Sequence, residues 1–274
     1  MTRCEVCFHH CELTEGQIGF CRGRINRGGR IESLTRNTVI SVALDPIEKK
    51  PLAFFHPGTM ILSLGSTGCN LRCPFCQNHA ISMASHDPVA ARLLSPEDAV
   101  ELALSLVPRG NIGIAFTYNE PLINIEYVEE TARLAHQAGL KTVLVTNGTA
   151  EEAVIRRILP TIDAFNIDLK GFTAEFYQVL SGDLDSVKRT IALCVGQAHV
   201  EITTLIIPGE NDDPEEMDAM AQWLASLDPN LPLHLTRFFP HYLWDDRPMT
   251  PLSTLKHLQT IAKRHLKRVR LGNV

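Results

Sequence analysis

The sequence predicts an α/β domain built on a parallel sheet, preceded by a small cysteine-rich module. From Met60 onward, apolar runs of strand length alternate with amphipathic segments of helix length. Strand and helix alternate six times, which requires crossover connections and therefore a parallel sheet. Seven of the eight cysteines fall into two clusters, and one cluster lies near the amino terminus, where periodicity is weak.

Residues 1–58 are expected to form a loop-rich module that needs a metal to fold, with short strands over 30–36 and 39–44. A segment this short cannot supply a core of its own, and clustered cysteines in a reducing compartment indicate metal binding rather than disulfides. Four thiolates saturate either a zinc ion or an iron-sulfur cluster, so both stay open as alternatives. The four residues, which we call the N-terminal cysteine group, are Cys4, Cys7, Cys11 and Cys21, spaced C-x2-C-x3-C-x9-C.

Residues 59–274 carry the predicted α/β domain. Two helices have clear start signals, since Ser95 and Asp213 are capping residues that each precede a proline. Periodicity does not separate a closed barrel, an incomplete barrel and a flat doubly wound sheet, but all three place the chemistry in loops at the carboxyl ends of the strands. Strands are expected over 60–66, 111–117, 140–146, 164–169, 199–207, 232–238 and 268–272, and helices over 95–107, 122–138, 150–159, 184–195, 213–228 and 251–265.

Composition narrows the classes of partner. The 274 residues include 26 Lys and Arg against 31 Asp and Glu, a net charge of -5, so the chain lacks the basic footprint of a non-specific nucleic-acid binder. No apolar run approaches the roughly 20 residues of a membrane span, and the first residues carry no signal-peptide core. We therefore expect a soluble, cytoplasmic protein with no nucleic-acid or membrane partner.

The loop after the first barrel strand holds the second cysteine cluster, and we call residues 68–79 the cysteine loop. Cys69, Cys73 and Cys76 are spaced C-x3-C-x2-C, and three thiolates this close in sequence face one centre. A four-iron cubane needs four ligands, so three cysteines leave one iron open to a non-protein ligand. The alternative is a structural zinc site completed by His79.

With Phe75 as the aromatic residue of C-x3-C-x-aromatic-C, the string CNLRCPFCQN resembles the radical S-adenosylmethionine (SAM) superfamily, in the branch of pyruvate formate-lyase activating enzyme. The N-terminal cysteine group and residues 45–52 are similar to the radical SAM member of the AmmeMemoRadiSam system, as are the landmarks 118–121, 146–148, 168–170, 237–240 and 271–274. The resemblance implies an incomplete (β/α)6 TIM-like barrel. It also implies a [4Fe-4S] cluster on Cys69, Cys73 and Cys76, with SAM bound at the open iron.

The same resemblance implies roles at successive strand ends: Glu120 for the SAM amino group, Lys170 for its carboxylate and Asp168 for its ribose. By the residues alone, Glu120 could instead belong to a helix start, Asn147-Gly148 to a turn, and Asp168 with Lys170 to a buried ion pair. Asp168 and Lys170 point to one face because side chains of a strand alternate. The further cofactor-binding residues that the resemblance implies are Phe75, Asn78, Tyr118, Asn119, Thr146 and Asn147, the last for the SAM ribose or carboxylate.

The activity that the resemblance implies is reductive cleavage of SAM to a 5'-deoxyadenosyl radical that abstracts hydrogen from a substrate. The leading interpretation is an oxidoreductase that acts on a glycyl radical enzyme or another protein. One alternative is a radical SAM enzyme with a small-molecule or peptide substrate, and another is a non-catalytic zinc-binding interaction module. A flavodoxin- or ferredoxin-type protein is the expected electron donor.

Two further features receive predictions from the residues alone. The basic stretch 256–270, with Lys263 and Lys267, is interpreted as a solvated helix face, or alternatively as a docking site for an acidic electron donor. Cys194 lies inside an apolar helical segment and is expected to be a buried, inert thiol.

Overall fold

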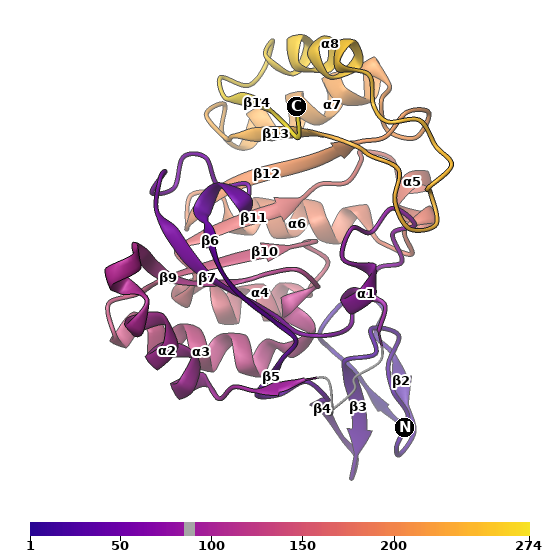
Figure 1. The fold of residues 1–274 in the computed structure, drawn as a ribbon. Coiled ribbons are helices and arrows are strands. Elements are labelled where there is room, and N and C mark those ends of the chain that lie inside the picture. The colour runs from indigo at the N-terminus through magenta and orange to yellow at the C-terminus, as the bar shows by residue number, and fades with distance from the viewer. Residues whose placement is uncertain (85–90) are drawn as a thin grey trace.

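The computed structural model describes residues 1–84 and 91–274 (Figure 1). Its main feature is an eight-stranded sheet with the order β14-β13-β12-β11-β10-β9-β7-β6. Neighbouring strands from β7 to β14 pair in parallel, and β6 pairs antiparallel with β7. The strands are β6 (Ser41–Pro46), β7 (Met60–Gly65), β9 (Asn111–Phe116), β10 (Lys141–Thr146), β11 (Ala164–Asp168), β12 (His199–Ile206), β13 (Leu233–Arg237) and β14 (Val269–Gly272).

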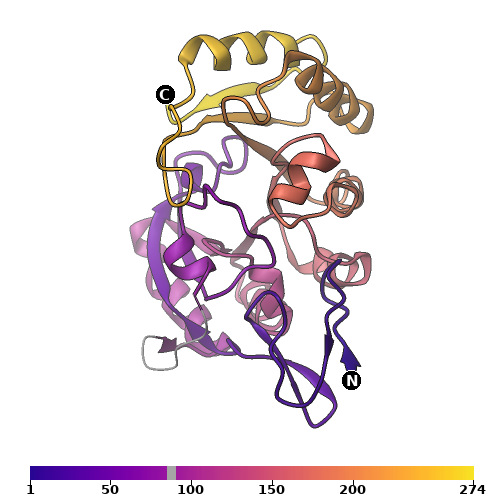
Figure 2. The same ribbon diagram turned by 90° about the vertical axis from the view of Figure 1, so that its right-hand side faces the viewer.

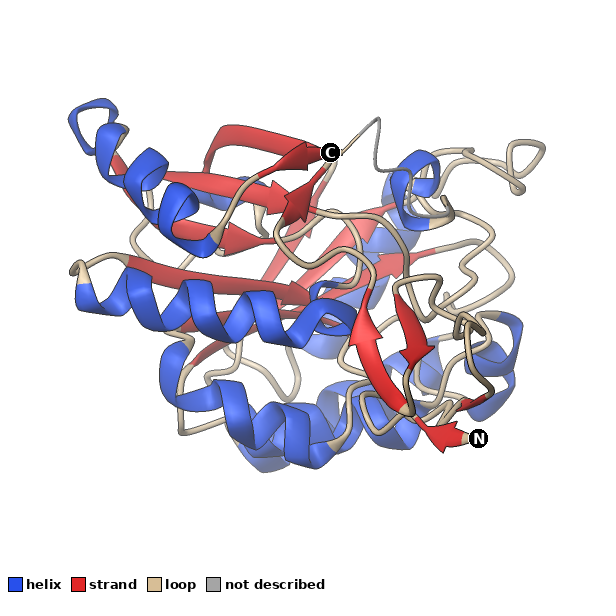
Figure 3. Cartoon of the chain, turned by 90° about the horizontal axis from the view of Figure 1, so that it is seen from below, coloured by secondary structure: helices blue, strands red, loops and turns tan. Residues whose placement is uncertain are grey.

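Helices connect the parallel strands and pack against the sheet, as Figure 3 shows. The sheet stays open, with β6 and β14 as its two edges, so the predicted incomplete barrel is confirmed. The α-helices are α1 (His79–Ser82), α2 (Pro96–Ser105), α3 (Ile125–Gln137), α4 (Glu152–Ile158), α5 (Ala174–Val179), α6 (Leu184–Cys194), α7 (Pro214–Leu227) and α8 (Leu252–Ala262), and short 3-10 helices cover Ile47–Lys49, Val107–Arg109, Pro121–Asn124 and Leu159–Thr161.

The predicted helix starts are correct because local side-chain chemistry fixes them. The Ser95 hydroxyl accepts a hydrogen bond from the Asp98 backbone N–H at 3.1 Å, and the Asp98 carboxylate accepts one from the Ser95 N–H at 3.3 Å, a capping box. Asp213 accepts from the N–H groups of Glu215 and Glu216 at 2.8 and 2.9 Å. Such caps satisfy N–H groups that a helix leaves without intrahelical partners.

The strand expected over 39–44 is present in a different arrangement. It splits into β5 (Thr38–Val39), which pairs with β8 (Arg92–Leu93), and β6, which joins the large sheet next to β7. The sequence signal of a strand does not say with which neighbour it pairs, since register and partner are set by tertiary packing. Residues 41–46 thus belong to the barrel sheet, and the domain boundary at residue 58 stays a prediction.

The remaining amino-terminal strands form two small antiparallel pairs beside α1 (Figure 1). They are β1 (Thr2–Arg3) with β2 (Glu12–Leu13), and β3 (Arg24–Arg27) with β4 (Arg30–Ser33). Leu13 and Ile25 are buried. These hairpins bring the N-terminal cysteine group against the carboxyl edge of the sheet.

The core of the barrel is made by strand side chains that are fully shielded from solvent. Ile114 of β9, Leu144 of β10 and Ile202 of β12 are examples that pack in one cluster with helix side chains, and complete burial of each contributes about 1.5–3 kcal/mol. Gly113 allows β9 and β10 to approach, since a Cβ there would lie 1.8 Å from the Lys141 carbonyl oxygen. Among the described residues, no helix is long and apolar enough to span a lipid bilayer.

Candidate active site at the carboxyl ends of the strands

A cavity of about 360 Å³ lies at the carboxyl ends and interior of the barrel strands. Its size falls within the range of small-molecule binding sites. All of the site residues that the sequence predicted for the SAM centre line it: Cys69, Cys73, Phe75, Cys76, Asn78, Tyr118, Asn119, Glu120, Thr146, Asn147, Asp168 and Lys170. The structure therefore brings these residues together, while the role of each stays a prediction.

The three thiols of the cysteine loop are free and largely shielded from solvent. Burial raises the pKa of Cys73 to about 11, and burial and the nearby Glu120 raise the pKa of Cys69. Three soft sulfur donors on one loop fit a metal centre, because bound metal cations stabilise thiolates. The donor set thus fits an iron-sulfur cluster held at three corners.

Aromatic packing closes one side of the cysteine loop. The Phe75 ring stacks against Phe176 with centroids 6.4 Å apart and lies 5.4 Å from the Trp244 ring. The loop after β13 reaches down to the cysteine loop in Figure 2, where the Leu243 N–H donates to the Pro74 carbonyl at 2.9 Å. This cover keeps water from the thiols on that side.

Glu120 is the most strongly perturbed carboxyl group of the cavity. It accepts hydrogen bonds from the backbone N–H groups of Leu122 (3.0 Å) and Asn147 (2.8 Å) and from the Thr146 hydroxyl (2.8 Å). Burial nevertheless raises the pKa of Glu120 to about 7, because these neutral donors only partly replace water. Glu120 faces the cavity and forms no ion pair within residues 1–84 and 91–274, so its carboxylate is suited to a positively charged ligand.

Asp168 and Lys170 form the ion pair that the sequence left open, with Nζ 2.9 Å from Oδ2. Burial alone would lower the pKa of Lys170, but the Asp168 carboxylate raises it, so the ammonium stays charged. Both residues also line the cavity. The ion pair and a contact with a bound cofactor are therefore compatible.

Tyr118 and Asn119 hold the loop after β9 in an unusual shape. Tyr118 has a φ of 74°, a left-handed conformation that is rare for residues other than glycine, and its hydroxyl donates to Asp45 at 2.6 Å. Asn119 accepts from the Ser66 N–H at 3.1 Å and donates to the Gly68 carbonyl at 3.0 Å. The side chain of Asn119 thus fixes the start of the cysteine loop.

Asn147 does not simply form a turn. Its side-chain nitrogen donates to the side-chain oxygen Oδ1 of Asn70 at 2.8 Å and lies 3.7 Å from the Cys69 sulfur. Its side-chain oxygen accepts from the Thr149 hydroxyl at 2.6 Å. The loop after β10 and the cysteine loop are therefore tied together by one amide.

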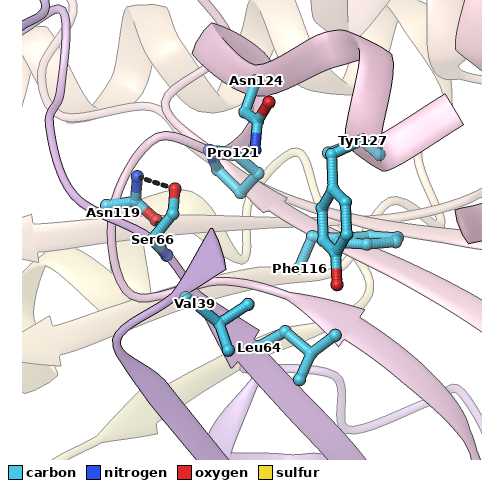
Figure 4. A pocket seen from close by; sticks show the side chains of 10 residues that line it. Val39, Leu64, Ser66, Phe116, Asn119, Pro121, Asn124 and Tyr127 are labelled. Carbon is cyan, nitrogen blue, oxygen red and sulfur yellow. Dashed lines mark hydrogen bonds between the residues drawn. The ribbon is translucent and has the colours of Figure 1, made fainter. Parts of the chain in front are cut away.

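A second, much smaller cavity of about 20 Å³ lies behind Asn119 (Figure 4). Its walls are mostly apolar, from Val39, Leu64 and Phe116, with the Tyr127 ring alongside. Figure 4 also shows the hydrogen bond between Asn119 and Ser66. A space of this volume admits about one water molecule and no cofactor.

Sequence reasoning did not identify several side chains of the large cavity. Thr203 and Leu205 are two apart on β12 and face inward together, a period-two signal that was available in the sequence. Lys49 and Asn273 lie outside the strands and are both exposed, one next to each edge of the open sheet. The cavity therefore reaches the side of the barrel where β6 and β14 do not pair.

The zinc alternative finds little geometric support at the cysteine loop. The His79 ring stacks on Tyr242, with centroids 4.4 Å apart, and His79 is not part of the cavity lining. Within residues 1–84 and 91–274, no three Cys, His, Asp or Glu side chains are already arranged to hold a metal ion.

The basic stretch lies far along the strands from the cysteine loop. The Arg268 carbonyl accepts from the Leu233 N–H at 2.9 Å, at the amino ends of β13 and β14. Lys263 and Lys267 are exposed there. They lie at the opposite end of the sheet from Cys69, Cys73 and Cys76, so the solvated-face interpretation is favoured over a docking site that feeds the cysteine loop.

Cys194 is fully buried in α6, and burial raises its pKa to about 12, as expected of an inert thiol.

Comparison with known proteins identifies the family. The family described as the radical SAM superfamily matches residues 64–224, and this chain belongs to it. Membership implies a [4Fe-4S] cluster and SAM as cofactors and defines the chain as a radical SAM enzyme in the general sense.

Individual relatives agree with this assignment. The chain is similar to an uncharacterized protein of Methanocaldococcus jannaschii, with 39% identity over 277 residues that cover 99% of this chain and 81% of that protein. It is more distantly similar to the pyruvate formate-lyase 1-activating enzyme of Escherichia coli, with 23% identity over 167 residues, 58% of this chain and 66% of the enzyme.

Solved structures show the fold. A radical SAM methyltransferase from Sphaerobacter thermophilus matches with a TM-score of 0.59 at 17% identity, covering 88% of this chain and 71% of that one. At this identity the likeness concerns the partial barrel alone.

Proposed function

We propose that this radical SAM enzyme generates a radical on a protein substrate, in the manner of activating enzymes for glycyl radical enzymes. The observation that carries the proposal is that three cysteines of one loop line the same cavity as Glu120, Asp168 and Lys170. The distant similarity to a pyruvate formate-lyase activating enzyme supports a protein substrate. When bound, the cluster and SAM supply the one-electron cleavage that gives methionine and a 5'-deoxyadenosyl radical able to abstract hydrogen.

The residues of the chain bind and orient these groups. Cys69, Cys73 and Cys76 would hold the cluster, Glu120 the SAM ammonium group and Lys170 the SAM carboxylate, each by charge-assisted hydrogen bonds. The other contacts proposed for SAM are Asp168 for its ribose and Asn147 for its ribose or carboxylate, with Phe75, Asn78, Tyr118, Asn119 and Thr146 completing the walls around it.

The opening of the cavity favours a large substrate. The Lys49 side chain is 68% exposed although it lines the cavity, so Lys49 marks the mouth. Asn273 lines the cavity from the other edge of the sheet. A loop of a protein could enter between these edges, while Phe75 and its aromatic neighbours shield the cysteine side from water.

A radical SAM enzyme with a small-molecule or peptide substrate is the second candidate. The observation that favours it is the volume of about 360 Å³, which suits a small molecule. A flavodoxin- or ferredoxin-type donor is proposed to reduce the cluster in either case. We also propose that the N-terminal cysteine group binds a second metal, as a further iron-sulfur cluster or as zinc.

The test is anaerobic incubation of reconstituted, dithionite-reduced protein with SAM, followed by detection of 5'-deoxyadenosine. Formation of 5'-deoxyadenosine is expected, and its absence from fully cluster-loaded protein contradicts the proposal. Pyruvate formate-lyase then serves as a protein probe. A glycyl-radical signal in electron paramagnetic resonance supports a protein substrate, whereas product from a small-molecule fraction and no protein radical supports the second candidate.

A further inference from the structure

The N-terminal cysteine group converges on one spot outside the active-site cavity. Its four thiols are free and, together with His9 and Arg24, line a closed space of about 10 Å³. Three buried thiols and the half-buried Cys11 line this space, and four cysteines are the donor set of closed, saturated metal sites.

Arg24 gives a second, independent indication of a metal-thiolate centre. Its side chain is buried, with 4% of its surface exposed, and its two terminal nitrogens bond Glu126 at 2.6 and 2.8 Å. Its Nε has no hydrogen-bond partner among the described residues, although Arg24 lines the space between the thiols and contacts Cys4. A buried N–H without an acceptor destabilises the fold, and a metal-bound thiolate is an anionic acceptor that removes this penalty.

A chain of polar contacts leads from this group to the SAM cavity. The Asn70 side chain contacts the Cys7 thiol, donates to the Thr149 hydroxyl at 2.8 Å and accepts from the Asn147 side chain at 2.8 Å. The Asn147 N–H in turn donates to the Glu120 carboxylate at 2.8 Å. Asn70 thus stands between a thiol of the N-terminal cysteine group and two residues of the cavity wall.

Backbone contacts make the same connection. A Cβ at Gly68, where φ is +90°, would lie 2.5 Å from the Cys21 carbonyl oxygen, so only glycine lets the cysteine loop pass this close. The His9 Nε2 lies 2.8 Å from the Asn70 carbonyl oxygen, and Arg72 donates to the Phe20 carbonyl. The amino-terminal module and the cysteine loop therefore pack as one unit.

We infer that a thiophilic metal centre on the N-terminal cysteine group holds Asn70 in place, and that Asn70 is a positioning residue that keeps Asn147 and Glu120 in register for SAM. The inference rests on the proposed function, because it concerns the shape of the SAM site. It applies equally to one zinc ion and to an iron-sulfur cluster, since either fixes the four thiolates around one point.

The experiment compares full-length Cys7→Ser and Cys11→Ser with Cys194→Ser as the matched control. Cys7 contacts Asn70, Cys11 is half-buried and has no hydrogen bond to Asn70 among the described residues, and Cys194 is a buried cysteine outside both groups. Each protein is prepared anaerobically with iron, sulfide and zinc, and iron, sulfide and zinc per chain are measured with the Kd for SAM. Both test variants are expected to lose the second metal, to keep the cluster of the cysteine loop and to bind SAM about 10-fold more weakly. The control is expected to match the wild type.

Several results would overturn the inference. Unchanged metal content in both test variants would show that the N-terminal cysteine group does not bind the second metal. Weaker SAM binding in Cys7→Ser but not in Cys11→Ser shows that the thiol contact acts without a metal. The amount of zinc or iron lost distinguishes the two kinds of centre, and either loss supports the inference.

Asn70→Ser covers the case in which the cysteine variants do not fold. With both metals retained, KM for SAM is expected to rise about 10-fold while kcat changes little, a split that general destabilisation does not produce. An unchanged KM overturns the positioning role. Failure of the proposed function is separate, since it would appear as wild-type protein that forms no 5'-deoxyadenosine.

Discussion

Two buried glutamates, one at each end of the barrel sheet, show how differently this fold treats charge. At the amino ends, Glu201 of β12 is fully buried, and its oxygens lie 2.9 and 2.6 Å from the Nε2 atoms of His199 and His234. The backbone N–H groups of Ala53 and Phe54 also donate to it. Burial would raise its pKa, but these hydrogen bonds lower the pKa of Glu201 to about 2.

At the carboxyl ends, Glu120 is also buried, but its hydrogen-bond donors among the described residues are all neutral, and burial raises its pKa to about 7. The amino end thus uses a buried charge to hold the structure together, whereas the carboxyl end keeps a poorly compensated charge facing a cavity. Such uncompensated groups are typical of functional sites, where stability is given up for binding. Substitutions at the two ends should therefore separate activity from stability.

The largest effect is expected for Cys73→Ala at the carboxyl end. Removal of one of three thiolates should prevent assembly of the catalytic cluster, so 5'-deoxyadenosine formation should fall below detection with little change in the free energy of unfolding of the metal-free protein. Cys194→Ala is the matched control and should keep full activity. Residual turnover in a cluster-free Cys73→Ala preparation would refute the assignment of this loop.

At the amino end, Glu201→Gln should lower the free energy of unfolding by about 3 kcal/mol at pH 7. Because the folded-state pKa lies below the ordinary value, the stabilisation is complete above about pH 4.5 and is lost as pH falls toward 2. Urea unfolding at a series of pH values measures the difference between the two proteins. If the two proteins have the same free energy of unfolding at pH 7, the contacts with His199 and His234 do not stabilise the Glu201 carboxylate.

Glu120 should show the opposite pH dependence. Its folded-state pKa is raised, so its contribution to the stability of the metal-free protein declines as pH rises from about 4.5 to about 7. The stability of the wild type minus that of Glu120→Gln should thus fall by about 3 kcal/mol over this range. A difference that does not vary with pH would mean that the two glutamates are in similar environments after all.

The smallest of these effects is expected for Lys170→Met. Loss of the ammonium removes the proposed partner of the SAM carboxylate and should weaken SAM binding about 10-fold, the range of one charge-assisted hydrogen bond. Equilibrium dialysis with cluster-loaded protein gives the Kd. Lys263→Met, at the other end of the sheet, is the control. If both variants bind SAM with equal affinity, Lys170 does not contact the SAM carboxylate and its role is limited to the ion pair with Asp168.

The strands and helices of the barrel could be predicted because their signals are local. Ser95 and Asp213 start helices through hydrogen bonds to residues two or three positions away, and the apolar periodicity of each strand is contained within the strand itself. The cysteine loop could likewise be predicted from the sequence, since Cys69, Cys73 and Cys76 are close in sequence and must face one centre.

Only the tertiary structure decided that β6 pairs with β7, that Asn70 joins Cys7 to Asn147, and that Glu120 and Glu201 differ. These features depend on which distant segments pack together, and therefore on which donors and how much water each buried group meets. Residue type and spacing say that a carboxylate is present, but burial and hydrogen-bond partners, which the whole fold supplies, set its charge and hence its use.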